Sequence, residues 1–159
     1  MNCSNCGKKM SSSREVIKYD VCGLDYVSLA NVQVWKCDGC GEREPVIPNI
    51  AGLHRVIALD VARSTAALRG CEIRFLRKYL GKSGAEAAAA LSVTPETMSR
   101  WENDKAKISS GAERFLRLMV FNQEPAQVYP LDELLADKKD RKPSPIKLDC
   151  GPSWTSASR

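Results

Sequence analysis

The chain has 159 residues, of which 43% are hydrophobic and 27% are charged, a composition typical of a soluble globular protein. This length accommodates one ordinary domain or two small ones, and no apolar run approaches the roughly 20 residues of a transmembrane helix. The N-terminus, MNCSNCGKKM, has no apolar segment of the kind found in a secretory signal. We therefore expect a cytoplasmic protein without a membrane partner.

The net charge of +5 is unevenly distributed along the chain. Acidic and basic residues balance over residues 1–45, whereas residues 72–120 contain nine basic and six acidic residues, a net charge of +3. A basic excess permits a polyanionic partner such as nucleic acid without requiring one. Any such interface is therefore expected in the second half of the chain.

Residues 1–48 contain two C-x2-C pairs, Cys3 with Cys6 and Cys37 with Cys40, and a glycine follows each pair. Such a short turn sets its two sulfur atoms at the spacing of a tetrahedral metal ion, and four thiolates suit Zn²⁺. A closed shell of four cysteines leaves no open position for catalysis. We therefore predict one structural zinc ion per chain and no enzymatic activity.

Other interpretations of the cysteines are less favoured. Seven cysteines, an odd number, and the lack of an export signal argue against a disulfide framework. A thioredoxin-type redox site needs a single C-x2-C pair in a βαβ context, and neither condition is met. Iron in the same four-thiolate cage remains an alternative to zinc. Cys22 and Cys71 are expected to be small buried residues, and Cys150 is expected to be one as well or a free thiol in the tail.

Between the cysteine pairs, residues 15–21 and 26–36 alternate partially between apolar and polar side chains, with Val32 and Val34 on one side. This pattern predicts short antiparallel strands. Residues 1–48 are thus predicted to form a small β module with little core of its own, so that the metal supplies much of its folding free energy. An amphipathic pattern then predicts a linker helix over residues 49–70, with Gly70 as its stop.

Residues 71–122 contain four short helical segments separated by tight turns. Ser83 is placed to cap the second segment, with Glu86 as its capping-box partner, and Thr94 is placed to cap the third. Ser109 or Ser110 begins the fourth segment. This helix density is that of a small DNA-binding domain. Residues 123–159 are polar and rich in Pro and Ser, which predicts a short helix and a disordered tail.

The third helical segment, TPETMSRWENDK, has only two large apolar side chains. On a helical wheel, Met98 and Trp101 face inward, whereas Glu96, Arg100 and Asn103 form a polar ridge on the opposite side. The preceding segment is nearly all alanine, which lets a neighbouring helix approach closely. A small-residue helix, a short turn and a capped polar helix are typical of a helix-turn-helix, whose second helix enters the major groove. An ordinary solvated helix face is the alternative.

Residues 73–109 resemble the Xre/Cro-type helix-turn-helix and read IRFLRKYLGKSGAEAAAALSVTPETMSRWENDKAKIS. With the four-cysteine module before it, the chain is similar to the YgiT-type zinc finger plus helix-turn-helix proteins, which include the MqsA antitoxins. The resemblance implies an α+β protein that represses its own operon as a homodimer on an inverted repeat of double-stranded DNA. It also implies an antitoxin with a small toxin protein as partner. A protein-interaction module with weak DNA binding is the alternative function.

The resemblance implies roles for individual residues. Arg100 matches a position that reads base edges, where a guanidinium pairs with guanine, and Glu96 matches a second such position, where a carboxylate accepts from cytosine. Pro95 is placed to touch a thymine methyl group. The side chains expected near phosphate groups are Ser83, Thr94, Thr97, Ser99, Asn103 and Lys105.

The same resemblance pairs Arg77 with Glu102 as a buried link between the first helix and the end of the recognition helix. The chain departs from the family pattern at three positions. Gly84 stands where glutamine usually holds a phosphate, so that contact is lost or moves to Ser83 and Lys82. Ser92 and Asp104 stand where glycine is common, and Asp104 adds a negative charge near the DNA.

Overall fold

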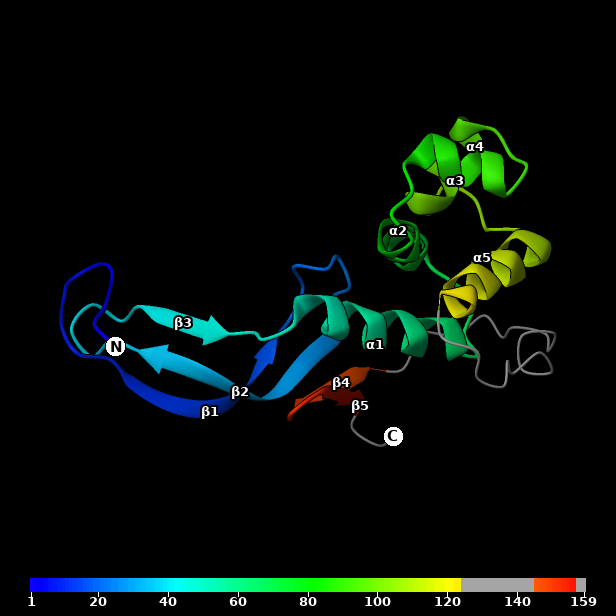
Figure 1. The fold of residues 1–159 in the computed structure, drawn as a ribbon. Helices are drawn as coiled ribbons and strands as arrows, with labels where there is room; N and C mark the ends of the chain where they lie inside the picture. Colours follow the sequence, from blue (N-terminus) through cyan, green and yellow to red (C-terminus); the bar gives the residue numbers. More distant parts are fainter. Residues whose placement is uncertain (124–144, 157–159) are drawn as a thin grey trace.

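The computed structural model describes residues 1–123 and 145–156, which form five helices and a five-stranded sheet (Figure 1). The helices are α1 (Ile50–Arg63), α2 (Gly70–Tyr79), α3 (Gly84–Ala90), α4 (Pro95–Glu102) and α5 (Ser110–Asn122). The strands are β1 (Ser11–Lys18), β2 (Val27–Lys36), β3 (Arg43–Val46), β4 (Ile146–Cys150) and β5 (Trp154–Ser156). The mixed α and β content expected from the sequence is confirmed.

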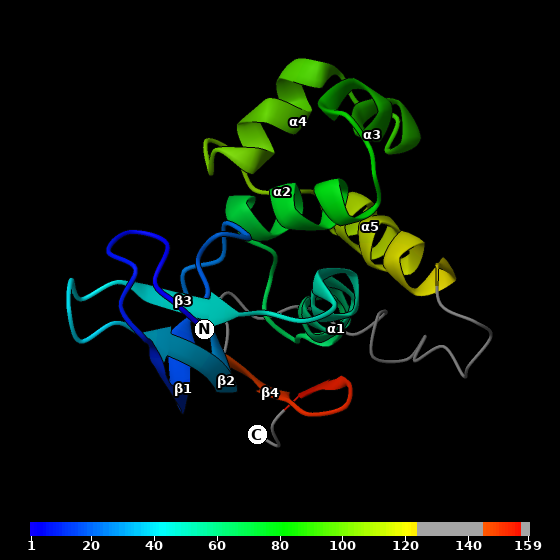
Figure 2. The ribbon, with the colours of Figure 1, turned by 60° about the vertical axis from the view of Figure 1, so that its left-hand side comes forward.

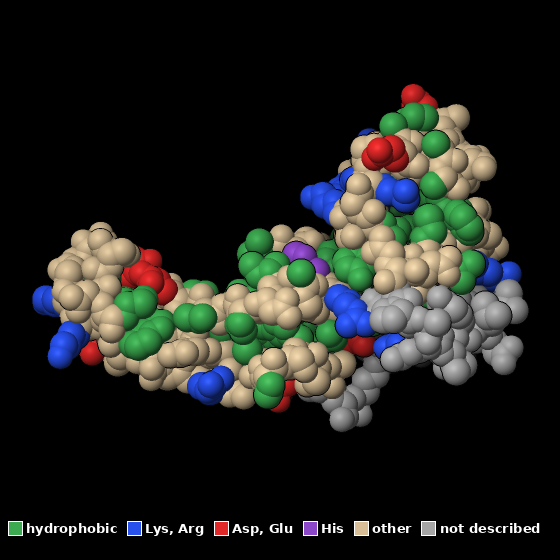
Figure 3. All heavy atoms as spheres, in the orientation of Figure 1, with side chains coloured by type: hydrophobic (Ala, Val, Ile, Leu, Met, Phe, Trp, Pro, Cys, Tyr) green, Lys and Arg blue, Asp and Glu red, His purple; other side chains and the backbone are tan. Residues whose placement is uncertain are grey.

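The molecule is bent, with an elongated sheet on one side and the helices α2 to α5 on the other (Figure 1). Helix α1 lies between the sheet and the other helices (Figure 2). The space-filling view shows acidic side chains at the end formed by α3 and α4, with basic side chains lower on the same face (Figure 3). The N-terminal turns and the α3–α4 pair therefore lie at opposite ends of the molecule.

The predicted antiparallel strands are confirmed as β1 and β2, and β3 pairs with the second half of β2. Val32 and Val34 are both buried, as their spacing indicates, but Leu29 is also buried three residues earlier. A bulge in β2 explains this odd spacing. Asn31 adopts a φ of 61°, and the register between β2 and β1 shifts beside it. The extra residue keeps the apolar side chains of both halves on the core side of the sheet.

The C-terminal segment is not disordered where the structure describes it. Strand β4 runs parallel to the first half of β2, and β5 pairs with β4 in antiparallel fashion. Ile146, Leu148 and Trp154 are buried, and the indole Nε1 of Trp154 donates to the Pro48 carbonyl at 2.8 Å. The prediction of a disordered tail is therefore wrong for residues 145–156. Their few apolar side chains pack against parts of the protein that are distant in the sequence, beside β2 and Pro48. The predicted short helix around residues 129–138 lies outside the described residues.

The linker helix is shorter than predicted, since α1 ends at Arg63 and Gly70 instead begins α2. The end of α1 is set by a residue far along the chain, Arg117 of α5, which is fully buried. Its guanidinium donates at 2.7–2.9 Å to four backbone carbonyl groups, those of Val61, Ala62, Ser64 and Ala66. A positive charge at the carboxyl end of a helix is also favourable for the helix dipole. Glu113 accepts from the same guanidinium at 2.7 Å, which neutralises the buried charge.

The sheet is joined to α2 by a small polar cluster. The Tyr26 hydroxyl donates to the buried carboxylate of Glu72 at 2.5 Å, and Glu72 also accepts from the backbone N–H of Arg69 at 2.7 Å. The Arg69 guanidinium lies 5.1 Å from the centre of the Tyr26 ring and pairs with Asp25 at 3.2 Å. Burial and the Glu72 carboxylate raise the pKa of Tyr26, so the phenol stays protonated. These contacts fix the start of α2 against the sheet.

Candidate functional sites: the cysteine cluster and the α4 surface

The two C-x2-C pairs meet at the far end of the sheet. The sulfur atoms of Cys3, Cys6, Cys37 and Cys40 all lie within 4.8 Å of one another. Cys3 is 3.5 Å from Cys40, and Cys6 is 3.3 Å from Cys37. A tetrahedral ion with metal–sulfur bonds of about 2.3 Å requires sulfur–sulfur distances of about 3.8 Å. The four thiols predicted as ligands are thus clustered in a way that can hold a metal ion.

Both turns of the cluster use the same backbone hydrogen bonds. In the first turn, the N–H of Gly7 donates to the Cys3 carbonyl at 2.9 Å, and the N–H of Cys3 donates to the Lys8 carbonyl at 2.8 Å. The second turn repeats both bonds at Gly41 and Cys37, each at 2.9 Å. The two glycines have φ values of 73° and 75°, which a side chain would disfavour. Two copies of one turn therefore face each other across the cluster.

The thiols of the cluster are not equivalent. Hydrogen bonds from the Cys6 thiol and from the backbone N–H groups of Cys40 and Gly39 lower the pKa of Cys37 to about 7. The Cys37 thiol therefore ionises more readily than an ordinary thiol. Because metal ligation requires thiolates, these hydrogen bonds prepare the cluster for a cation.

The helix starts predicted for α3 and α4 are confirmed. The Ser83 hydroxyl accepts from the N–H of Glu86 at 3.2 Å, and the Glu86 carboxylate accepts from the N–H of Ser83 at 2.7 Å. The Thr94 hydroxyl accepts from the N–H of Thr97 at 3.2 Å. Pro95 occupies the first turn of α4, where its missing N–H costs nothing. The first turn of each helix is therefore capped by the side chain of the residue that precedes the helix.

The turn between α3 and α4 depends on Ser92, which has a φ of 55°. Its N–H donates to the Ala89 carbonyl at 3.1 Å, and the N–H of Val93 donates to the Ala88 carbonyl at 2.9 Å. These bonds close the end of α3 and turn the chain sharply into α4. Serine, unlike glycine, is strained in this left-handed conformation.

Replacing Ser92 with glycine is expected to raise the free energy of unfolding by about 1 kcal/mol, because glycine relieves the left-handed strain. Chemical denaturation of both proteins measures the difference. Ser109→Gly serves as the control and is expected to be slightly destabilised, since Ser109 has a φ of −67°, gains no such relief and loses the hydrogen bond from the N–H of Ala112 to its hydroxyl. If Ser92→Gly is destabilised as well, the strain assigned to this turn is wrong.

Helix α4 packs through one narrow face. Met98 and Trp101 are its buried residues, and the buried Ala87 and Ala88 of α3 leave room for close packing. The side chains that α4 and its N-cap expose to solvent are Thr94, Pro95, Glu96, Ser99 and Arg100, with Thr97 half-buried. The polar ridge predicted from the helical wheel is therefore present, since Glu96, Arg100 and Asn103 are all exposed.

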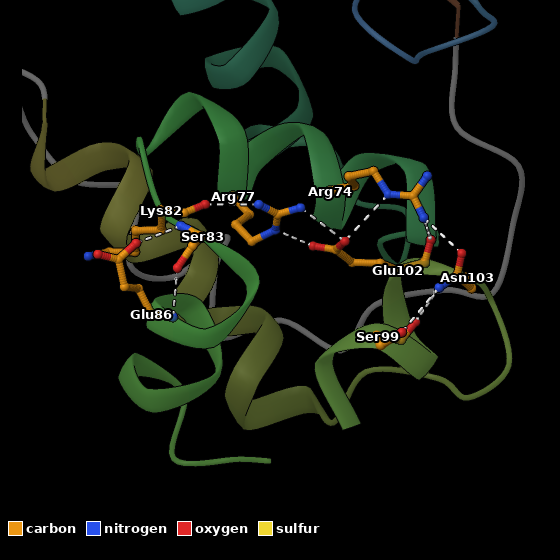
Figure 4. Close-up of polar contacts among 8 residues, drawn as sticks. All are labelled: Arg74, Arg77, Lys82, Ser83, Glu86, Ser99, Glu102 and Asn103. Carbon is orange, nitrogen blue, oxygen red and sulfur yellow. Dashed lines mark hydrogen bonds and ion pairs between the residues drawn. The ribbon is translucent and has the colours of Figure 1, made fainter. Parts of the chain in front are cut away.

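Asn103 is exposed, but both ends of its amide are hydrogen-bonded within the protein. Its amide oxygen accepts from the Arg74 guanidinium at 2.9 Å, and its Nδ2 donates to the Ser99 carbonyl at 2.7 Å (Figure 4). Arg74 also donates to the Glu102 carbonyl at 2.9 Å. Sequence reasoning missed Arg74, although it lies three residues before Arg77 and thus on the same side of α2. Asn103 therefore belongs to the contact with α2 as well as to the exposed ridge, whereas the Ser99 side chain is hydrogen-bonded only to Asn103 among the described residues.

The expected link between Arg77 and Glu102 is present, although both side chains are half-buried rather than buried. The Arg77 guanidinium donates to both carboxylate oxygens of Glu102, with Nη2 at 3.1 Å from Oε2, and its Nη1 donates to the Lys82 carbonyl at 2.9 Å (Figure 4). The hydrogen bond to Glu102 raises the pKa of Arg77, so the guanidinium stays charged. One side chain of α2 thus joins the end of α4 to the chain just before α3.

Asp104 directs its charge into the protein. It has a φ of 54°, and its carboxylate accepts from the N–H of Gly70 at 2.6 Å, at the start of α2. A negative charge is favourable at this helix end. Gly70 is needed there, because an added Cβ would lie 2.6 Å from the Glu102 carbonyl oxygen. Lys105 follows with an exposed side chain.

Comparison of the chain with family models, with curated proteins and with solved structures gives no match. None of the helices within residues 1–123 and 145–156 has the length and apolar character needed to cross a membrane. The case for a function therefore depends on the motifs and on the geometry of these two sites.

Proposed function

We propose that the protein is a sequence-specific DNA-binding regulator of transcription, with α4 as its recognition helix. The observation that carries this proposal is that α4 buries Met98 and Trp101 while exposing Arg100 and Glu96. A polar helix held by one narrow face, after a tight turn and a small-residue helix, has the arrangement of a major-groove reader. The firm link of α4 to α2 through Arg77 supports this, because a reading helix must be held rigidly.

In this proposal, Arg100 reads guanine through O6 and N7, Glu96 accepts from cytosine N4, and Pro95 contacts a thymine methyl group. The side chains assigned to phosphate groups are Ser83, Thr94, Thr97, Ser99 and Lys105. Asn103 is assigned a structural role instead of a phosphate contact. Both ends of its amide already have partners, because it links the end of α4 to Arg74. Asp104 does not repel the DNA strongly in this arrangement, because its carboxylate faces the start of α2.

The proposal includes a structural zinc ion at the four cysteines. Four thiolates at one point match the tetrahedral preference of Zn²⁺ and leave no ligand position for a substrate. The ion would join the two symmetric turns. Few buried apolar contacts do so otherwise, because the hydrophobic cluster at this end consists of Cys3, Met10 and Cys37, with Trp35 packed against it.

A homodimer on an inverted repeat is part of the proposal, because one short helix reads only a few base pairs and two copies give useful affinity. The resemblance to zinc finger plus helix-turn-helix proteins supports repression of the protein's own operon. The same resemblance supports an antitoxin role with a small toxin protein as partner.

Replacing Arg100 with alanine is expected to abolish specific DNA binding, with a loss of about 1–3 kcal/mol per half-site. Fluorescence anisotropy with DNA from the protein's own promoter, at one fixed salt concentration, measures this loss. Arg43→Ala is the matched control, since it removes the same charge from an exposed arginine on β3. Retention of full affinity by the Arg100 variant would show that α4 is not the recognition helix.

A second function, a protein-interaction module, is favoured by one observation. Strand β1 is one of the outer strands of the sheet among the described residues, and most of its side chains are exposed. The sheet thus offers an edge to a partner protein, far from α4 (Figure 1). Co-purification with the product of an adjacent gene, together with no affinity for promoter DNA, would support this function over the first.

A further inference from the structure

We propose that two copies of the chain pair through a small uncharged surface where the end of α3 meets the start of α5. A hollow of about 260 Å³ marks this surface, and its lining residues are Ala90, Leu91, Ser92, Gly111, Ala112 and Phe115. The surface would form the homodimer of the proposed function, so this inference rests on that function. It lies apart from both the cysteine cluster and the polar ridge of α4.

Phe115 is the side chain of this surface that gains most from a partner. It is 45% exposed, and it is the only aromatic residue among the exposed large hydrophobic side chains of residues 1–123 and 145–156. Leu118 and Met119, both half-buried, follow three and four residues later on the same side of α5. Burial of the Phe115 ring would remove apolar surface from water, so an apolar contact on this side of α5 is favourable.

The hollow beside Phe115 has room for the ring of a second molecule. Ser92 and Gly111 are exposed, and Ala90 and Ala112 are half-buried, so small residues form most of its accessible surface. A Cβ added at Gly111 would meet nothing within 4 Å. An aromatic side chain from outside can therefore enter the hollow without displacing other parts of the chain.

Two observations favour a second copy of the chain over a different protein. The surface carries both an exposed ring and a hollow beside it, so two copies related by a two-fold axis can each place Phe115 in the hollow of the other. A two-fold contact also brings identical residues close together, and none of the six lining residues is charged. Like charges therefore do not face each other at the centre of the contact.

The position of this surface suits a dimer that reads DNA. Ser92 lies in the turn that leads into α4, and α5 follows the connection after α4. A two-fold axis through this surface would hold the two α4 helices at one separation, which sets the spacing of the half-sites. The hollow admits little more than one ring from each copy, so the dimer is expected to dissociate in the micromolar range without DNA.

Sedimentation equilibrium of the full-length protein without DNA measures the dissociation constant of this dimer. Phe115→Ala is expected to raise the constant at least about tenfold, because the ring no longer fills the partner's hollow. Gly111→Glu is expected to raise it by a similar factor, since it places two like charges across the axis. An acidic residue in the first turn of α5 is compatible with the helix dipole, so this variant is expected to fold.

Gly84→Glu is the matched control. It adds the same charge in the first turn of α3, where an added Cβ also meets nothing within 4 Å, but Gly84 does not line the hollow. This variant is expected to leave the dissociation constant unchanged.

The surface would be refuted by a protein that stays monomeric up to about 1 mM, or by an unchanged dissociation constant in either Phe115→Ala or Gly111→Glu. An equal rise in the Gly84 variant would refute it as well. A monomer that loses a different bound protein on Phe115→Ala would assign the surface to that protein instead of a second copy. A dimer weakened by both variants in a protein without affinity for DNA would leave the surface in place and refute the proposed function.

Discussion

Replacing Cys37 with serine is expected to remove the bound metal and to unfold the end of the sheet that carries the two turns. A serine hydroxyl does not ionise near neutral pH, so the site loses one of its four thiolate ligands. Structural zinc supplies about 10–16 kcal/mol of binding free energy in zinc-finger peptides, and this end of the sheet has only a small buried cluster without it. Helices α2 to α5 are expected to stay folded, because their core does not include the four clustered cysteines.

Elemental analysis and hydrogen exchange together test this prediction. The unmodified protein should contain one zinc ion per chain, and the variant should contain none and lose amide protection at the two turns while α2 to α5 stay protected. Cys22→Ser is the matched control, since Cys22 is a half-buried thiol outside the cluster. A Cys37 variant with full metal content and unchanged protection would contradict the metal site. Tightly bound iron in its place would correct the identity of the ion.

Replacing Arg117 with methionine is expected to destabilise the whole helical part by about 3–5 kcal/mol. The change leaves the buried carboxylate of Glu113 without its partner and four carbonyl groups at the end of α1 without a donor. Removing both charges in a Glu113→Leu, Arg117→Met double variant should recover part of the loss, because no unpaired charge is then buried.

Urea denaturation of the two variants measures these free energies of unfolding. Arg43→Met, at an exposed arginine, is expected to stay within about 0.5 kcal/mol of the unmodified protein. A loss of less than about 1 kcal/mol for Arg117→Met would show that the buried guanidinium does not hold α1 and α5 together.

The features predicted correctly from the sequence are local in the chain. The capping residues Ser83 and Thr94 act on backbone groups three residues away, so their spacing is visible in the sequence. Each C-x2-C pair is also a local turn. Only the contact between the two pairs, which are more than 30 residues apart, had to be inferred from the preference of a metal ion for four ligands. The Arg77–Glu102 link spans 25 residues and was expected only from the resemblance to known helix-turn-helix proteins.

The features that were missed depend on contacts between distant parts of the chain. Arg117 sets the end of α1 from more than 50 residues away, and Trp154 reaches Pro48 across 106 residues. Ile146 and Leu148 alternate as in a strand, but charged and small residues around them obscured this signal. The helical wheel placed Asn103 correctly on the exposed side, but a wheel contains no information about its hydrogen bond to Arg74 on the neighbouring helix.

The central claim, that α4 reads DNA, is tested most directly by selection of binding sites from a random-sequence duplex library, with full-length protein at fixed salt. Selection is expected to enrich an inverted repeat whose half-sites are about 10 base pairs apart, centre to centre. A guanine in each half-site should lose its enrichment when Arg100→Ala is used. A library that shows no enrichment over its input, even at low salt, would contradict the claim.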